Sequence, residues 1–196
     1  LVGNLSEVLC EKIDSIIQSA IENPNPEIFS FIEFIDDFSM KKFHFSKWKR
    51  VHLKIVPYFT TFCEVLSILN SKLEFTSLSQ SIFMLLIGIV STTKKVTPSF
   101  LSVIQQMMVL FFELKTNTFL HNSCVKAFNL LSSIGELNSK FLDELDLFKT
   151  VTDCYEKNEV NSMISFIGQL RLISDIIGQF VANSKTVDIE KWNKFV

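Results

Sequence analysis

The sequence predicts an all-α fold in which about eight or nine antiparallel helices stack as a right-handed solenoid. Residues that interrupt regular structure are scarce, because the 196 residues include only five Gly and four Pro, well below the usual share of about 12%. Asn-Gly and Asp-Gly pairs, the strongest hairpin signals, are absent from the sequence. Hydrophobic residues make up 47% and include twenty Phe, a composition that excludes intrinsic disorder and predicts a large core.

The third observation is that breaks in the helical pattern recur at intervals of about 20 to 27 residues. They fall near Asn23, His44, Ser71, Lys95, Asn117, Leu137, Glu159 and Lys185. Two helices per unit give a period of about 46 residues, which is typical of HEAT and armadillo repeats. A four-helix bundle would have only about four long elements. Residues 1–196 are therefore interpreted as one helical-repeat segment.

The first half of the chain contains two clear proline signals. Residues 23–26 read Asn-Pro-Asn-Pro and predict the turn of the first helical hairpin. Pro57 lies within an otherwise helical stretch, residues 47–70, and should kink or split it. The longest apolar run, residues 82–90, is too short to span a membrane, which needs about 20 residues. It is interpreted as a buried helix.

The later helices follow from caps and apolar stripes. Thr97 is a predicted N-cap with Pro98 at the first helical position, and Asn117 is the next N-cap, with Gly135 ending that helix. The predicted stripes are Phe100, Ile104, Met107, Phe111 and Leu114; then Leu120, Cys124, Ala127, Leu131 and Ile134; then Val160, Ile164, Ile167, Leu170, Ile173 and Ile177.

Several classes of function are excluded or disfavoured. A net charge of −2 argues against a general nucleic-acid binder, and no glycine-rich phosphate loop occurs. The four widely spaced cysteines predict buried thiols in a reducing compartment rather than a zinc site or disulfides. We expect no cofactor or metal. No signal peptide opens the sequence, and Leu1 suggests a segment of a longer protein.

Two groups of residues have side chains that could support catalysis or bind a metal. His121 and Cys124 are three positions apart and could share a helix face, as a thiolate–imidazole pair requires. Because no glycine-made oxyanion loop is near, His121 is instead predicted to hydrogen-bond across an inter-helix turn. The acidic groups Asp36-Asp37 and Asp143-Glu144-Asp146 lack the alternation of a calcium loop and are interpreted as solvated helix faces.

Charge is distributed unevenly, which suggests a binding surface. Six basic residues lie between positions 41 and 54 with no acid among them, whereas residues 136–159 carry seven acids and three lysines. A basic patch attracts an acidic partner. Trp48 lies within the basic run and favours an interface. The basic residues are Lys41, Lys42, Lys47, Lys49, Arg50 and Lys54.

Residues 50–56 (RVHLKIV), 111–122 (FFELKTNTFLHN), 167–174 (IGQLRLIS) and 192–195 (WNKF) together resemble the SAPS-domain family. That family comprises regulatory subunits of protein phosphatase 6 and of its fungal counterpart. The resemblance covers roughly residues 47–196. Thr116, Thr118 and Gln169 stand where the family typically has Trp, Asn and His.

The resemblance implies a non-catalytic scaffold, part of a longer SAPS-like domain, which holds a cytoplasmic type 2A-like Ser/Thr phosphatase catalytic subunit and directs it to substrates. Further adaptor proteins are possible partners, and no nucleic acid or membrane span is expected. In the Phe-Leu-His turn, Asn117 should cap the helix, Phe119 and Leu120 should pack it onto its predecessor, and His121 should tie the joint. Gly168 belongs to the third motif.

The expected partner-binding residues are Trp48, Lys49, Arg50 and Lys54, with Arg171 and Trp192 as secondary candidates. Two other functions remain open from the sequence. One is an unrelated helical-repeat adaptor in trafficking or cytoskeletal assembly, and the other is an enzyme that uses His121 and Cys124. The first interpretation, in which the chain has no catalytic residues of its own, is the one we favour.

Overall fold

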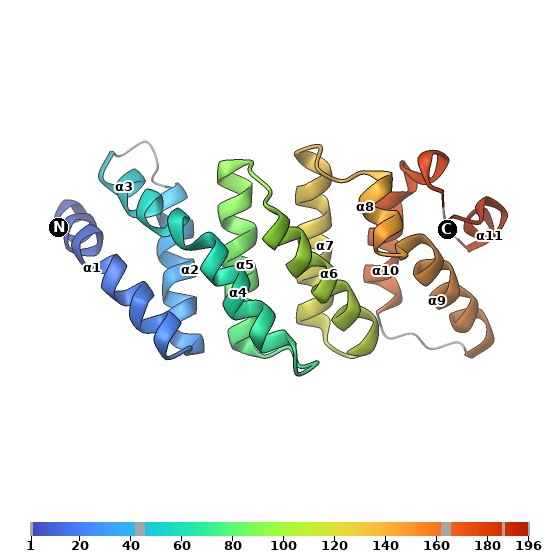
Figure 1. Ribbon diagram of the computed structural model, residues 1–196, viewed down its shortest axis with the longest axis horizontal. Helices are drawn as coiled ribbons and strands as arrows, with labels where there is room; N and C mark the ends of the chain where they lie inside the picture. Colours follow the sequence, from blue (N-terminus) through green and yellow to red (C-terminus); the bar gives the residue numbers. More distant parts are fainter. Residues whose placement is uncertain (1, 42–45, 162–165, 186, 196) are drawn as a thin grey trace. The chain divides into compact units, whose positions relative to one another are not determined.

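The computed structural model describes residues 2–41, 46–161, 166–185 and 187–195, and all regular structure in these ranges is helical (Figure 1). The all-α prediction is therefore confirmed for these residues. The α-helices are α1 (Val2–Glu22), α2 (Pro26–Lys41), α3 (Ser46–Ile55), α4 (Phe59–Asn70), α5 (Ser77–Thr93), α6 (Pro98–Glu113), α7 (Thr118–Ser133), α8 (Ser139–Glu144), α9 (Leu147–Asn161), α10 (Ile167–Gly178) and α11 (Ile189–Phe195). Two 3-10 turns, η1 (Val56–Tyr58) and η2 (Val181–Asn183), lie between them.

The chain forms two compact units, Leu1–Leu110 and Phe111–Val196. In the first, α1 packs on α3, and α2 packs on both α3 and α5. The Ser30 and Ser81 hydroxyls lie 2.7 Å apart, and a Cβ placed on Gly88 would lie 3.6 Å from the Asp36 carboxylate. Both pairs join α2 to α5 at similar sequence offsets, so these helices run parallel.

The core of the first unit is rich in phenylalanine. Phe29, Phe62, Phe83 and Phe100 are fully buried, and the rings of Phe29 and Phe62 meet edge to face with centroids 5.7 Å apart. Aromatic rings of this size supply much of the apolar area that a helical core buries. Packing in this core thus explains part of the high phenylalanine content of the sequence.

In the second unit, α7 and α10 also run parallel. The Gln169 amide donates to Asn122 Oδ1 over 3.2 Å, and the Gln179 amide donates to the Ser132 hydroxyl over 3.1 Å. Each bond joins residues 47 positions apart, so the register is the same at both places. The short helix α11 packs on α9.

Several local predictions are confirmed. The Thr97 hydroxyl accepts from the Phe100 N–H over 3.2 Å at the start of α6, which begins at Pro98. Gly135 follows α7 with a φ of 74°, the left-handed conformation that glycine tolerates best. The turn at residues 23–26 separates α1 from α2 as expected.

Three boundaries differ from, or refine, the prediction. Pro57 splits its helix, because η1 separates α3 from α4. The helix predicted between Leu137 and Glu159 is divided into α8 and α9, with Asp146 between them in a left-handed conformation. The break predicted near Glu159 lies two residues later, because α9 continues to Asn161. Val160 therefore belongs to α9 rather than to the stripe of α10, and Ile164 lies outside the described residues.

One helical stretch of the described chain, Trp48–Asn70, is long and apolar enough to cross a membrane by length and composition. It is interrupted by η1 at Pro57, and it carries His52, which is hydrogen-bonded to a carboxylate inside the unit. A core helix passes the same test of length and composition. We interpret the stretch as two core helices of the first unit.

Candidate functional site

Helix α3 presents two different faces. Trp48, Val51, His52 and Ile55 are buried, as spacings of three and four residues along a helix require. The other face exposes Lys49 and Arg50, and Leu53 on that face is 53% exposed. Because Leu53 is four residues from Lys49 and three from Arg50, the three side chains are neighbours on the helix surface. They form what we call the α3 basic face.

The two tryptophans predicted as interface anchors are core residues of this chain. Trp48 is only 2% exposed, and its ring meets that of Phe38 edge to face, with centroids 4.8 Å apart. Trp192 is 5% exposed and packs against Phe148, with centroids 5.4 Å apart. Both bury a large apolar ring between helices, so neither belongs to the candidate surface.

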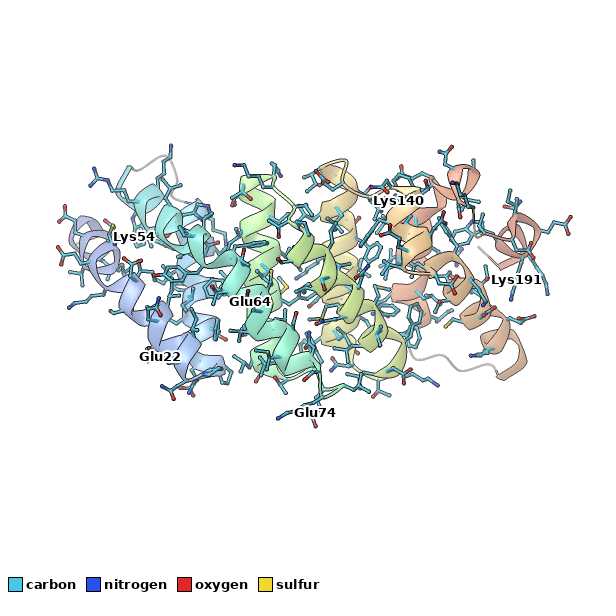
Figure 2. The ribbon with its side chains drawn as sticks, in the orientation of Figure 1. Glu22, Lys54, Glu64, Glu74, Lys140 and Lys191 are labelled. Atoms are coloured by element: carbon cyan, nitrogen blue, oxygen red, sulfur yellow. The ribbon has the colours of Figure 1, made fainter. Side chains whose placement is uncertain are left out.

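Lys54 ties α3 to α1. Its ammonium lies 2.5 Å from Asp14 Oδ2, and the hydrogen bond to Asp14 raises the pKa of Lys54. Figure 2 labels Lys54 beside α3. At the end of α2, Lys41 pairs with Asp37 over 2.5 Å. The basic run is thus partly neutralised, while the side chains of Lys42 and Lys47 lie outside the described residues.

The secondary candidate Arg171 belongs to the second unit. It is exposed on α10, next to Leu172, which is 51% exposed. Gly168, on the same helix, is exposed, and a Cβ placed on it would meet nothing within 4 Å. No steric requirement for glycine is therefore visible at this position among the described residues.

A buried polar network joins α2, α3 and α5, and the sequence did not reveal it. His52 Nδ1 lies 2.6 Å from Asp36 Oδ1, and His52 Nε2 lies 3.2 Å from the Thr92 hydroxyl. Asp36 and His52 are 2% and 3% exposed. The interpretation of Asp36 as a solvated residue is therefore wrong, because its carboxylate is buried with an imidazole partner.

Asp143 also differs from the sequence prediction. Its carboxylate accepts from the Ser184 hydroxyl over 2.5 Å and from the Lys185 N–H over 3.0 Å. Asp143 is therefore not only a solvated residue of a helix face, because its carboxylate holds the segment that follows η2. Among the described residues, no group of three or more His, Cys, Asp or Glu is arranged to hold a metal ion.

The joint between α6 and α7 contains the Phe-Leu-His turn. Asn117 caps α7 by accepting from the Leu120 N–H over 3.0 Å, and Leu120 is fully buried. The His121 Nε2–H donates to the Phe111 carbonyl over 3.0 Å. The predicted cap at Asn117 and the predicted hydrogen bond of His121 are confirmed, and the burial of Leu120 agrees with a packing role. Phe119 was predicted to pack onto the preceding helix, and this is wrong, because it is 68% exposed.

Aromatic packing surrounds the His121 imidazole. Its ring centroid lies 4.6 Å from that of Phe111 and 4.8 Å from that of Phe166. Burial lowers the pKa of His121, and the hydrogen bond to the Phe111 carbonyl opposes this shift in part. The imidazole is thus held as a neutral hydrogen-bond donor at a helix joint.

The cysteine environments disfavour a thiolate nucleophile. Cys124 is 1% exposed, and burial raises its pKa. Burial likewise raises the pKa of Cys63 to about 12. Because the thiolate is the reactive species, a pairing of Cys124 with His121 gains no chemical support from this arrangement.

No family model matches the sequence, and neither a curated protein nor a solved structure matches the chain.

Proposed function

We propose that this chain is a non-catalytic helical-repeat scaffold that binds a type 2A-like Ser/Thr phosphatase catalytic subunit in the cytoplasm and directs it to substrates. The observation that supports this most is the α6–α7 joint. The segment that resembles the SAPS-domain family there has a coherent structural role, through the Asn117 cap, the buried Leu120 and the bond from His121 to Phe111.

A right-handed solenoid is part of the same proposal. Its support is the parallel pairing of helices at similar offsets, which are 51 residues for the α2–α5 hydroxyl pair and 47 residues for both α7–α10 bonds. Repeat folds place equivalent helices of successive units side by side in parallel. The offsets are close to the period of about 46 expected from the sequence.

The α3 basic face, consisting of Lys49, Arg50 and Leu53, is the surface we propose for the catalytic subunit. It combines two exposed cations with an exposed apolar side chain, and such a mixture suits an acidic partner surface. Lys54 is left out of this surface, because its charge is engaged by Asp14. Arg171 and Leu172 on α10 are a secondary candidate in the second unit.

Charge reversal tests this surface. The double variant Lys49→Glu/Arg50→Glu should weaken capture of a purified type 2A-like catalytic subunit by about tenfold or more, since it replaces attraction by repulsion. The matched control is Lys94→Glu/Lys95→Glu, which reverses two exposed lysines in the loop before α6 of the same unit. Surface plasmon resonance measures both affinities, and circular dichroism verifies folding. Unchanged capture by the first variant would remove the α3 basic face from the proposal.

The alternative is an unrelated helical-repeat adaptor in trafficking or cytoskeletal assembly. It is favoured by one observation: Thr116, which replaces the Trp of the family motif, is exposed in the turn before α7. A tryptophan there would be a typical contact residue, and this chain lacks it. Affinity purification from the source cell followed by mass spectrometry distinguishes the two functions, because only the first predicts a phosphatase catalytic chain.

A further inference from the structure

A second surface of the first unit has the features of a helix-binding groove. It is an open depression of about 430 Å³ between α1 and α2, lined by Ser15, Ile16, Ser19, Glu27, Ile28 and Phe31. Helix α1 packs chiefly on α3, and α2 packs chiefly on α5. The sides of α1 and α2 that line the groove are therefore left without a covering helix in the described part of the chain.

Apolar side chains extend the groove along both helices. Phe31 is 41% exposed and Phe34 is 60% exposed on α2, and Leu5 and Val8 on α1 are 53% and 55% exposed. Val8 and Ser15 are seven residues apart and so share a helix face. Exposed large hydrophobic residues gathered in this way typically mark an interaction site.

The segment that contains the two groove helices is acidic. Residues 2–41 contain eight acidic residues and two lysines, a net charge of −6. Within the unit, Lys54 pairs with Asp14, His52 with Asp36 and Lys41 with Asp37, so these acids are not available to a ligand in the groove. Glu27 lines the groove, and Glu22 is exposed at the end of α1, where Figure 2 labels it.

We propose that this groove binds an amphipathic α-helix of a partner protein, with an apolar face that meets Ile28 and Phe31 and basic residues that meet Glu22 and Glu27. Helices bind grooves of this kind through apolar anchors spaced three and four residues apart, and cationic flanks complement the exposed carboxylates of Glu22 and Glu27. The inference is independent of the phosphatase proposal, because it concerns other residues.

The same charge argues against two other occupants. A symmetric dimer through this groove would bring the exposed Glu22 and Glu27 of both copies to one interface, and like charges across an interface disfavour association. An anionic membrane surface attracts basic rather than acidic segments. The basic amphipathic helix is therefore the occupant that fits both the apolar lining and the charge.

A designed peptide tests the inference on the intact chain. The probe is a fluorescent helix of about 18 residues, roughly five turns, with Leu on one face and Lys elsewhere. One control peptide has the same composition in scrambled order, and another has Glu in place of Lys. Fluorescence anisotropy should show binding of the first peptide only, weakening as salt rises from about 0.05 to about 0.3 M.

Variants locate the site. Phe31→Asp should weaken binding of the Leu/Lys peptide by about tenfold, and Glu22→Lys/Glu27→Lys should weaken it and reduce its salt dependence. The matched control is Ile68→Asp, at an exposed side chain lining a different groove between α4 and α6. Ile68→Asp should leave peptide binding unchanged. If Phe31→Asp unfolds the chain, Phe34→Asp takes its place.

Three results would overturn the inference. The scrambled or the Glu peptide binds as tightly as the Leu/Lys peptide, or the Phe31→Asp and Phe34→Asp variants bind it like the unmodified chain. The third is a concentration-dependent dimer in analytical ultracentrifugation that Phe31→Asp abolishes, which would show that a second copy covers the groove.

Discussion

At the residue scale, neighbouring side chains of the same type have opposite roles. Asp36 is buried against His52, whereas Asp37 is exposed and pairs with Lys41 one turn further along α2. A buried carboxylate depends on its partner for solvation, whereas an exposed ion pair contributes little to stability. The two adjacent acids therefore form a natural matched pair for mutagenesis.

We expect Asp36→Asn to lower the free energy of unfolding by about 2–4 kcal/mol, because it weakens a buried charge-assisted hydrogen bond to His52. Asp37→Asn should change it by less than about 0.5 kcal/mol, as is usual for surface substitutions. Urea denaturation followed by circular dichroism measures both values. Equal effects of the two substitutions would contradict the structural role of the network.

The Phe-Leu-His turn provides a second contrast. Leu120→Ala should lower the free energy of unfolding by about 2–5 kcal/mol, because Leu120 is fully buried and its loss leaves a cavity. Phe119→Ser should change it by less than about 0.5 kcal/mol, because Phe119 is 68% exposed. The same denaturation experiment tests this, and a large loss for Phe119→Ser would restore the original packing prediction.

The helix caps could be predicted from the sequence, whereas the buried pair of Asp36 and His52 could not. Capping by Asn117 and Thr97 was predictable, because a cap depends on residues within one turn. Asp36 follows Phe29 and Ile32 at helical spacing, a signal that it lies on the buried face, but its partner His52 comes from another helix. The spacing within one helix does not specify such a long-range pair.

At the element scale, the α6–α7 joint should respond to pH through His121. Burial places the pKa of the folded-state imidazole below its usual value of 6.5, so the unfolded chain binds the proton more readily. The stability that His121 contributes is therefore present above pH 6.5 and lost as pH falls from there through the folded-state pKa.

The variant His121→Gln isolates this effect, because glutamine can still donate to the Phe111 carbonyl but does not titrate. We expect the thermal midpoint of the unmodified chain to fall more between about pH 7.5 and pH 5 than that of the variant. Calorimetry at matched ionic strength measures both profiles. Parallel profiles would mean that His121 is not a source of the pH dependence.

Some helix boundaries could be predicted from the sequence pattern and others could not. Pro57 and the turn at residues 23–26 were predictable, because proline restricts its own backbone and removes a donor. The division into α8 and α9 was not, because Asp146 adopts a left-handed conformation without a glycine to signal it. The regular spacing of breaks in the sequence thus predicted the order of the helices, but it did not predict the number of helices.

At the scale of the whole molecule, the two compact units predict unequal local stability. Asp36→Asn should increase hydrogen exchange in α2, α3 and α5 while leaving α9 and α11 largely protected, because Asp36 belongs to the first unit and separate cooperative units open independently. Native-state exchange with mass spectrometry measures each helix. A uniform loss of protection along the chain would indicate a single cooperative unit instead.

The parallel pairing of α7 with α10 has a kinetic consequence. Its two side-chain hydrogen bonds each join residues 47 positions apart. The chain between them must therefore close a long loop before either hydrogen bond can form. Closing a loop of that length carries an entropic cost that a simple helical hairpin avoids. Refolding should therefore be slower than in helical proteins of the same size whose contacts are mostly local.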